Sequence, residues 1–352
     1  KTYNHTYTKG YPTDFETIIS EEGYGAKPYK TKTKKLVLVN APGPGSGKLA
    51  TCLSQLYHEH KRGINAGYAK FETFPVWNLP LKHPVNIAYE AATADLKDIN
   101  MIDPFHLEKY NINAVNYNRD VETFPILKNI LHHITGKDIY FSPTDMGVNM
   151  VGYCIKNNDI VENAAKKEVV RRYFNELCNY KQGISDFDTV QKIKLLMNEL
   201  NIDENFLKVV EVSKKASEKK KTNVIALELP KGKIITGKQT DLLSPASSVI
   251  INAIKELSKI PDEINLLSPT ILEPILKLRK NNNTLSLQEV LIALAVCSVT
   301  NPSIASALEK LEVLKDCEAH ATYIVTNGDL KALKSLKINL TCEPNFYSKE
   351  IM

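Results

Sequence analysis

The chain is 352 residues long, with 43% hydrophobic and 24% charged residues, so its composition is that of a globular protein and excludes a disordered or fibrous chain. One hydrophobic core rarely organises this many residues, and we therefore expect two or three domains. A net charge of +5, spread along the chain, is too small to predict a nucleic-acid partner.

The cysteines and the apolar runs bear on where in the cell the protein is located. The six cysteines are far apart and lie mostly in apolar runs, which predicts reduced, buried thiols in a cytoplasmic protein. No apolar run is long enough to span a bilayer and no signal peptide is recognisable, so we expect no membrane partner. The chain starts at Lys1 without a methionine, which suggests a fragment or a processed product.

The strongest functional signal lies in residues 34–60. The apolar run at 36–39 predicts a strand, a loop of Pro, Gly and Ser follows, and the next residues have apolar side chains at helical spacing. This order forms a cradle for an anion, because backbone N–H groups, a helix N-terminus and a lysine converge there. We expect a nucleotide or another phosphorylated ligand to bind at Gly43, Gly45, Ser46, Gly47 and Lys48.

The glycine loop departs from the Walker A pattern G-x-x-x-x-G-K-[ST] at two positions. Pro42 replaces the first glycine, and Leu49 replaces the Ser or Thr whose hydroxyl holds Mg²⁺. Phosphate binding tolerates both changes, whereas hydrolysis would need Mg²⁺ held by carboxylates elsewhere. The alternative is a glycine-rich strand-to-helix turn with Lys48 exposed to solvent.

Two further polar groups are candidates for the other side of a ligand. Asn118, Arg119 and Asp120 follow a short run that, as a strand, would place them at its carboxyl end, where open α/β sheets bind ligands. Arg119 would then hold a phosphate, and Asp120 a metal ion or a hydroxyl group. Asp145 lies in a polar turn of similar composition. An Arg–Asp pair closing a surface turn and a capped helix start explain these residues equally well.

The rest of the chain divides into a helical stretch and an α/β unit. Residues 159–215 repeat apolar side chains at helical spacing, which predicts an insert with its charges on solvated faces, and residues 214–221 predict a linker. A hairpin is expected at 224–237 with Gly232 at its turn. Helices are expected at 247–257, 271–279, 286–299, 304–314 and 329–336, and strands at 264–267, 321–326 and 338–340. This alternation predicts a three-layer α/β sandwich.

Cys317, His320 and Cys342 are the residues that most resemble a metal site. With Glu318 or Glu343 as a base they match the ligand types of zinc deaminases, which makes a zinc-dependent hydrolase one alternative function. The C-x-x-C half of that pattern is absent, so buried thiols and a hydrogen-bonded histidine are the preferred interpretation, and no metal ligand is assigned.

Several stretches give the chain a specific resemblance. These stretches are GYPTDFETIISEEGYG (10–25), APGPGSGKLATCLSQLYHEHKRG (41–63), YAKFETFPVWNLPLKHPVNIAYEAATADL (68–96), NMIDPFHLEKY (100–110), AVNYNRDVETFP (114–125), SPTDMGVNMVG (142–152), CEAHATYIV and INLTCEP. Through them the chain resembles a bacterial family of functionally uncharacterised proteins. Some members of that family carry the name ATP-dependent peptidase. The resemblance implies that this chain corresponds to the central and C-terminal parts of family members. It also implies a C-terminal domain of cytidine-deaminase-like topology. The peptidase name finds no support in the residues, because neither H-E-x-x-H nor a Ser or Cys triad motif is present.

The prediction is therefore an α/β protein in three parts. They are a P-loop-like parallel-sheet domain at 1–155, a helical insert and linker at 156–221, and a C-terminal α/β domain at 222–352. We expect a small phosphorylated ligand, with ATP or another nucleotide and Mg²⁺ as cofactor, and a homo-oligomer; no catalytic residue is assigned. A non-catalytic scaffolding protein is the alternative from a different functional class.

Overall fold

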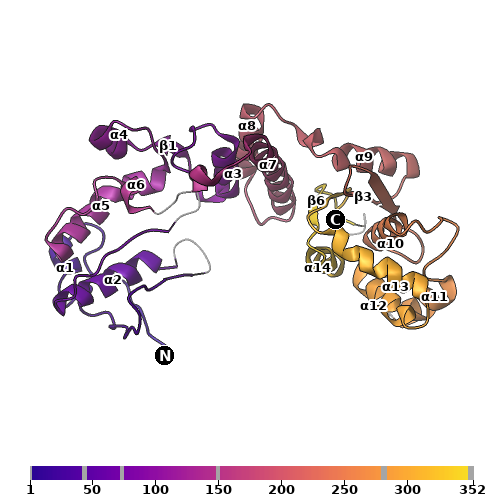
Figure 1. Ribbon diagram of the computed structural model, residues 1–352, viewed down its shortest axis with the longest axis horizontal. Helices are drawn as coiled ribbons and strands as arrows, with labels where there is room; N and C mark the ends of the chain where they lie inside the picture. The colour runs from indigo at the N-terminus through magenta and orange to yellow at the C-terminus, as the bar shows by residue number, and fades with distance from the viewer. Residues whose placement is uncertain (1, 42–45, 72–74, 148–150, 279–283, 348–352) are drawn as a thin grey trace. The chain divides into compact units, whose positions relative to one another are not determined.

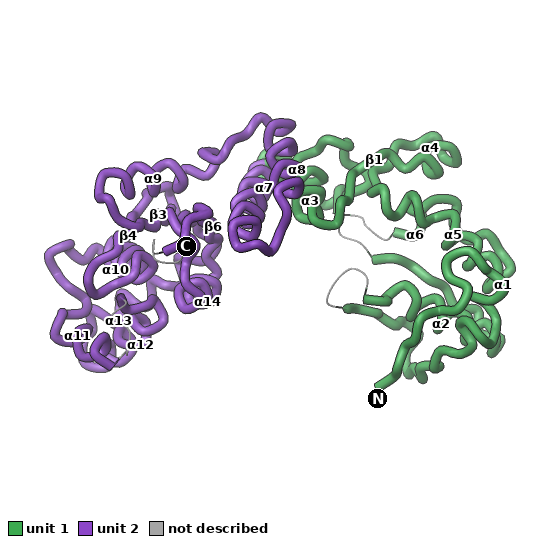
Figure 2. The backbone as a smooth tube through the Cα atoms, turned by 180° about the vertical axis from the view of Figure 1, so that it is seen from behind, with its two compact units in different colours: residues 1–162 green, residues 163–352 purple. Residues whose placement is uncertain are grey.

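The computed structural model describes residues 2–41, 46–71, 75–147, 151–278 and 284–347. The chain forms two compact units, residues 1–162 and 163–352 (Figure 2). Within the described ranges no helix is both long and apolar enough to cross a membrane. The two units are taken in turn.

The regular secondary structure of unit 1 consists mainly of helices, and local side chains start several of them. Asp14, His83, Asp103 and Ser142 each accept a hydrogen bond from a first-turn N–H group of the helix that follows. The elements are α1 (Phe15–Ile18), α2 (Lys48–Lys61), α3 (Pro84–Ala92), η1 (Ala94–Leu96), β1 (Asn100–Ile102), α4 (Pro104–Tyr110), β2 (Val115–Tyr117), α5 (Asn118–Thr135), α6 (Pro143–Met146) and η2 (Val151–Cys154).

A core of unit 1 lies between α2 and α5. Leu53 and Leu56 of α2 belong to one buried cluster with Phe124, Leu127 and Ile130 of α5. These residues recur every three or four positions, so each helix turns one apolar face towards the other. α5 begins directly after β2, and the core therefore fixes the place where the strand passes into the helix.

The strand expected at residues 36–39 is absent, which corrects the sequence-based prediction. Leu36, Val37, Leu38 and Val39 have no regular secondary structure, and their exposed fractions are 77%, 52%, 82% and 38%. Within the described residues of unit 1 the sheet consists of β1 and β2, which are antiparallel, so the expected parallel sheet is not found there. Local β-propensity does not hold an isolated strand, because its backbone N–H and C=O groups need a neighbouring strand.

Unit 2 contains the C-terminal sheet and the helices around it (Figure 1). Helix α7 (Asn158–Lys181) begins at the end of unit 1 and continues into unit 2. The elements that follow are α8 (Phe187–Glu199), η3 (Glu204–Phe206), α9 (Lys208–Lys220), β3 (Val224–Glu228), β4 (Ile234–Lys238), α10 (Pro245–Leu257), α11 (Pro269–Lys277), α12 (Leu287–Ser298), α13 (Pro302–Glu309), η4 (Lys310–Leu314), β5 (Glu318–Ala321), α14 (Asn327–Ser335) and β6 (Asn339–Cys342).

The sheet of unit 2 has helices on both faces, as the sequence predicts. Its strand order is β4-β3-β5-β6, with β3 antiparallel to β4 and β5, and β5 parallel to β6. Ile225 and Leu227 of β3 face the core with α10, α12 and α14, and the intervening Ala226 faces the other side, because successive strand residues alternate. Figure 1 shows α9 and α10 on either side of β3.

Several strand predictions for unit 2 need correction, although the hairpin is confirmed. Gly232 has a φ of 84° in the turn between β3 and β4. No strand forms at 264–267, where Leu266 and Leu267 are buried against the core from a loop. The strand expected at 321–326 lies at Glu318–Ala321 instead, because pairing with β3 places Ala319 opposite Leu227.

Candidate functional site

The predicted glycine loop leads directly into α2. Gly47 is the N-cap residue with a φ of 81°, and as a glycine it supplies no side-chain cap of its own. Glycine is favoured in this left-handed conformation, and a Cβ placed on Gly47 would meet no atom within 4 Å. Ser46 is exposed and Lys48 is half-buried, whereas Gly43 and Gly45 lie outside the described residues. The helix N-terminus expected from the sequence is therefore present.

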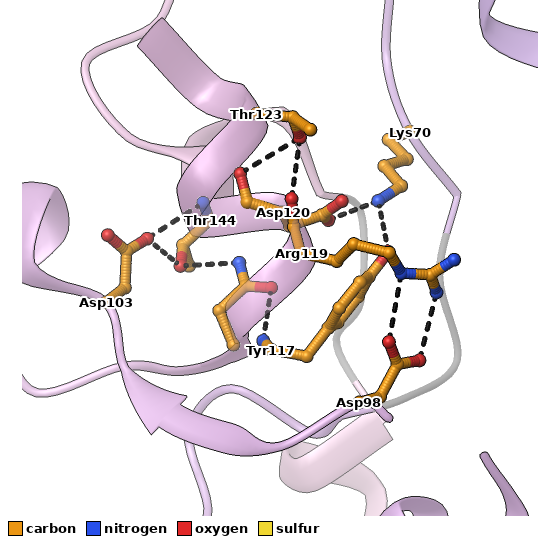
Figure 3. A network of polar contacts seen from close by, with 9 residues as sticks. Lys70, Asp98, Asp103, Tyr117, Arg119, Asp120, Thr123 and Thr144 are labelled. Carbon is orange, nitrogen blue, oxygen red and sulfur yellow. Dashed lines mark hydrogen bonds and ion pairs between the residues drawn. The ribbon is translucent and has the colours of Figure 1, made fainter. Parts of the chain in front are cut away.

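Arg119, at the start of α5, is held by Asp98 (Figure 3). Its Nε lies 2.9 Å from Asp98 Oδ1, and its Nη2 donates to Asp98 Oδ2 at 2.9 Å. The Asp98 side chain is 1% exposed and that of Arg119 is 43% exposed. Burial opposes the charge on Arg119, but the Asp98 carboxylate and nearby tyrosines raise its pKa overall. The two parallel contacts that a phosphate would need are thus made to a buried carboxylate.

Asp120 is paired in a similar way with a distant lysine. Lys70 Nζ forms an ion pair with Asp120 and donates a hydrogen bond to the Tyr117 hydroxyl at 2.7 Å (Figure 3). The Lys70 backbone N–H also donates to the Met146 carbonyl at 2.8 Å. Asp120 therefore helps to fix residues around Lys70 to the β2–α5 junction.

Asn118 and Asp145 make local contacts at the ends of elements. The Asn118 side chain accepts a hydrogen bond from the Ile99 N–H at 2.9 Å. Asp145 Oδ2 accepts hydrogen bonds from the Tyr110 hydroxyl at 2.9 Å and the Ser142 N–H at 3.2 Å, the latter as part of a capping box. Asp145 therefore takes part in the capped helix start that was the alternative for this turn, and the role of both residues as ligands remains a prediction.

Asp103 was not singled out from the sequence, but its side chain is fully buried and joins two elements of this region. Its Oδ1 accepts hydrogen bonds from the Phe105 and His106 N–H groups at 3.0 and 3.1 Å. Its Oδ2 accepts from the Thr144 N–H and hydroxyl at 3.1 and 2.6 Å. Asp103 thereby joins the start of α4 to α6. The Asp103-Pro104 pair before a helix is the local signal that could have identified Asp103 as a helix N-cap.

A small cavity adjoins this polar network. It measures about 20 Å³, and Trp77, Asn116 and Thr144 are among its lining residues. That volume holds about one water molecule and is far too small for a nucleotide. Among the described residues, the network around Asp98, Asp103 and Asp120 therefore joins secondary-structure elements, and the cavity beside it is too small for a ligand of this size.

The proposed zinc ligands of unit 2 do not come together. His320 is fully buried, with Nδ1 2.8 Å from the Thr341 hydroxyl and Nε2 3.1 Å from Glu343 Oε1. Cys317 belongs to the core on the other side of the sheet, because residues three apart along a strand face opposite ways. Among the described residues, no three His, Cys, Asp or Glu side chains are placed to hold a metal ion.

The charges near His320 are more buried than the sequence analysis expected. Lys214 of α9 lies 2.9 Å from Glu343, and Arg171 of α7 lies 2.7 Å from Glu318 of β5. Burial raises the pKa of Glu343, but His320 and Lys214 lower it more, so the net shift is downward. These pairs correct two predictions: Arg171 and Lys214 do not lie on purely solvated faces, and much of the expected linker is the end of α9.

The comparisons with known proteins cover the whole chain. Residues 1–201 match the domain of unknown function DUF1846, N-terminal, and residues 205–352 match DUF1846, C-terminal. A UPF0371 protein of Clostridium botulinum is 54% identical over 365 residues, and one of Clostridium tetani is 52% identical over 365 residues. Both alignments include 100% of this chain and 73% of the relative. The chain therefore belongs to the DUF1846 (UPF0371) family of bacterial proteins, whose function is uncharacterised.

Proposed function

We propose that the protein binds a nucleotide or another phosphorylated metabolite at the N-terminus of α2. The observation that carries the proposal is the helix start itself. Gly47, which has no side chain to cap the helix, adopts the left-handed conformation, and Lys48 occupies the first helical position. The preceding residues 43–46 add two glycines and a serine.

The electrostatics of a helix start favour an anion at this position. An α-helix leaves its first N–H groups without intrahelical partners, and its dipole places about half a positive charge at this end. Helix α2 has 14 residues, so its dipole is well developed, and its first turn contains no acidic residue. A phosphate would accept hydrogen bonds from the N–H groups of Leu49 and Ala50 while the Lys48 ammonium neutralises part of its charge.

We propose the β2–α5 junction as the contact for the far side of the ligand. Arg119 has a third guanidinium nitrogen beyond the two that pair with Asp98, and its side chain is 43% exposed. We propose this group as the contact for a second phosphate, with Asn118, Asp120 and Asp145 as its polar neighbours. Asp120 would have to exchange Lys70 for the ligand or its Mg²⁺.

Phosphoryl transfer is a further step that the residues support less well. Leu49 supplies no hydroxyl for Mg²⁺, and Asp98, Asp103 and Asp120 are each held by protein groups. The described carboxylates of this unit therefore do not form a ready Mg²⁺ site. ATP with its own Mg²⁺ is the ligand to test first, and binding is the activity we propose.

Isothermal titration calorimetry of the whole chain with ATP and with inorganic phosphate tests the proposal. We expect Lys48→Ala to weaken ATP binding at least about tenfold, which corresponds to about 1.4 kcal/mol. Lys331→Ala, which alters an exposed lysine of α14 in unit 2, is the control and leaves the affinity unchanged. An unaltered protein without affinity for either ligand, or equal affinity in the Lys48 variant, would refute the proposal.

A further inference from the structure

Helix α12 of unit 2 is apolar on both of its faces. Val290, Ala293 and Leu294 are at most 6% exposed and pack into the core. On the opposite face Ile292, Val296 and Val299 are 60%, 67% and 85% exposed. Their spacing of four and three residues places them in one stripe along the helix and the turn after it. A surface helix normally carries polar side chains on such a face.

The stripe lies in a part of the chain that carries no charge. Residues 290–308 contain no Lys, Arg, Asp or Glu, in a protein of which 24% of residues are charged. Helix α13 continues this surface: Pro302, Ser303 and Ser306 are exposed, whereas Ile304 and Ala307 point into the core. Figure 1 shows α12 and α13 side by side in unit 2. The exposed face of α12 and the start of α13 are called the α12 face below.

We propose that the α12 face binds the same face of a second copy of this chain. A partner with charged groups would bury them against a surface that offers no counter-charge, which is costly. The partner must therefore bring an uncharged, apolar face, and α12 is itself such a face. An isologous dimer satisfies this requirement, since each copy contributes the same patch.

The spacing of the stripe fits two-fold symmetry. In an antiparallel pair of α12 helices, Val296 lies near the axis, and Ile292 of each copy lies opposite Val299 of its partner. The described helix has 12 residues and is therefore about 18 Å long, and its rows of side chains can interdigitate as ridges in grooves. The exposed small residue Ala295, next to Val296 on the helix, allows the two backbones to approach closely.

The size of the α12 face sets the strength of the dimer. Stable interfaces bury about 800 Å² per partner, and one three-turn helix with the start of its neighbour lies at or below that area. We therefore expect a concentration-dependent dimer. A lipid surface is the less suitable partner, because the charged residues that flank this part of the chain, Glu289 on one side and Glu309 and Lys310 on the other, have no net positive charge to attract anionic lipids.

Sedimentation velocity over a hundredfold range of protein concentration tests the proposal. We expect the unaltered chain to pass from monomer to dimer and Val296→Glu to remain monomeric throughout. Leu195→Glu is the matched control, since Leu195 of α8 is 64% exposed, and it should dimerise like the unaltered chain. Equal melting temperatures for the three proteins exclude misfolding. A monomeric unaltered chain, or a dimer that survives in Val296→Glu, overturns the proposal.

Cross-linking tests the symmetry separately. A cysteine at Val296, in a chain whose Cys154 and Cys297 are replaced by serine, should form a disulfide-linked dimer on mild oxidation, because the two copies of this position meet near the axis. A cysteine at Leu195 in the same background should not. Binding of phosphatidylcholine vesicles by a chain that stays monomeric and uncross-linked would assign the face to lipid and overturn the dimer.

Discussion

Replacing Arg119 with alanine separates a structural role of this residue from a ligand-binding one. In the structure Arg119 makes two contacts of 2.9 Å to Asp98, whose side chain is 1% exposed. Arg119→Ala removes this guanidinium group from beside a buried carboxylate. We therefore expect the substitution to destabilise unit 1 before it affects any ligand.

The loss of unfolding free energy expected for Arg119→Ala lies between two limits. Breaking a fully buried ion pair costs about 3–5 kcal/mol, and an exposed pair contributes about 0–1 kcal/mol. Asp98 is buried, but the Arg119 side chain is 43% exposed, so water can enter the space that the variant opens. We expect a loss of about 2 kcal/mol for Arg119→Ala. Asp98→Ala should cost less, about 1 kcal/mol, because it leaves a half-exposed arginine that water can solvate.

Urea denaturation followed by the fluorescence of Trp77 measures these changes in unit 1. Trp77 is the single tryptophan of the chain, and its carbonyl accepts a hydrogen bond from the Val115 N–H in β2, close to the junction. A double-mutant cycle with Asp98→Ala isolates the pair. The exposed pair of His132 and Asp138 is the control, and Asp138→Ala should change stability by less than about 0.5 kcal/mol. A coupling energy near zero, or a ligand-affinity loss without destabilisation, would refute the structural assignment of Arg119.

Three further predictions concern single positions. Gly47→Ala places a Cβ on a residue whose φ is 81°, so the free energy of unfolding in urea should fall by about 1–2 kcal/mol. A fall of less than a few tenths of a kcal/mol would argue against this backbone conformation. Phe124→Ala, at 1% exposure in the core of unit 1, should cost about 3–5 kcal/mol by Trp77 fluorescence, and a smaller effect would place Phe124 outside the core. Burial raises the pKa of the Asp329 carboxyl group above its usual 3.8. Because the native state therefore holds this proton more tightly than the unfolded chain, the protein loses stability as the pH rises through the native pKa. Asp329→Asn should therefore gain stability relative to the unaltered chain between pH 4 and pH 7 in urea unfolding, and the opposite trend would refute this assignment.

Local signals in the sequence predicted the elements whose conformation depends mainly on their own residues. Helix α2 follows from apolar spacing after a glycine, and the β3–β4 hairpin follows from Gly232, which adopts the positive φ that the turn requires. Ser142 precedes a proline and caps the helix that follows, which is a signal that spans only a few residues. The same signal is present at Asp103, although the sequence analysis made no use of it. Family membership was also recognisable, because its motifs are runs of neighbouring residues.

Contacts between distant residues were not predictable in this way. Arg119 pairs with a residue 21 positions away and Asp120 with one 50 positions away, and no spacing in the sequence marks either partner. From the sequence, Arg119 and Asp120 were consequently either contacts for a ligand or a surface pair with each other. The structure shows both with protein partners.

The sequence by itself determined which segments have a strong local preference, namely the capped helices, the glycine start of α2 and the hairpin of unit 2. Only the tertiary structure decided which apolar runs become strands and which charges are buried. Residues 36–39 remain unpaired although they favour β structure, and Cys317 and His320 are separated by the sheet between them. The physical reason is the same in both cases. Strand pairing and burial depend on partners brought from elsewhere in the chain, and these partners contribute more free energy than local propensity does.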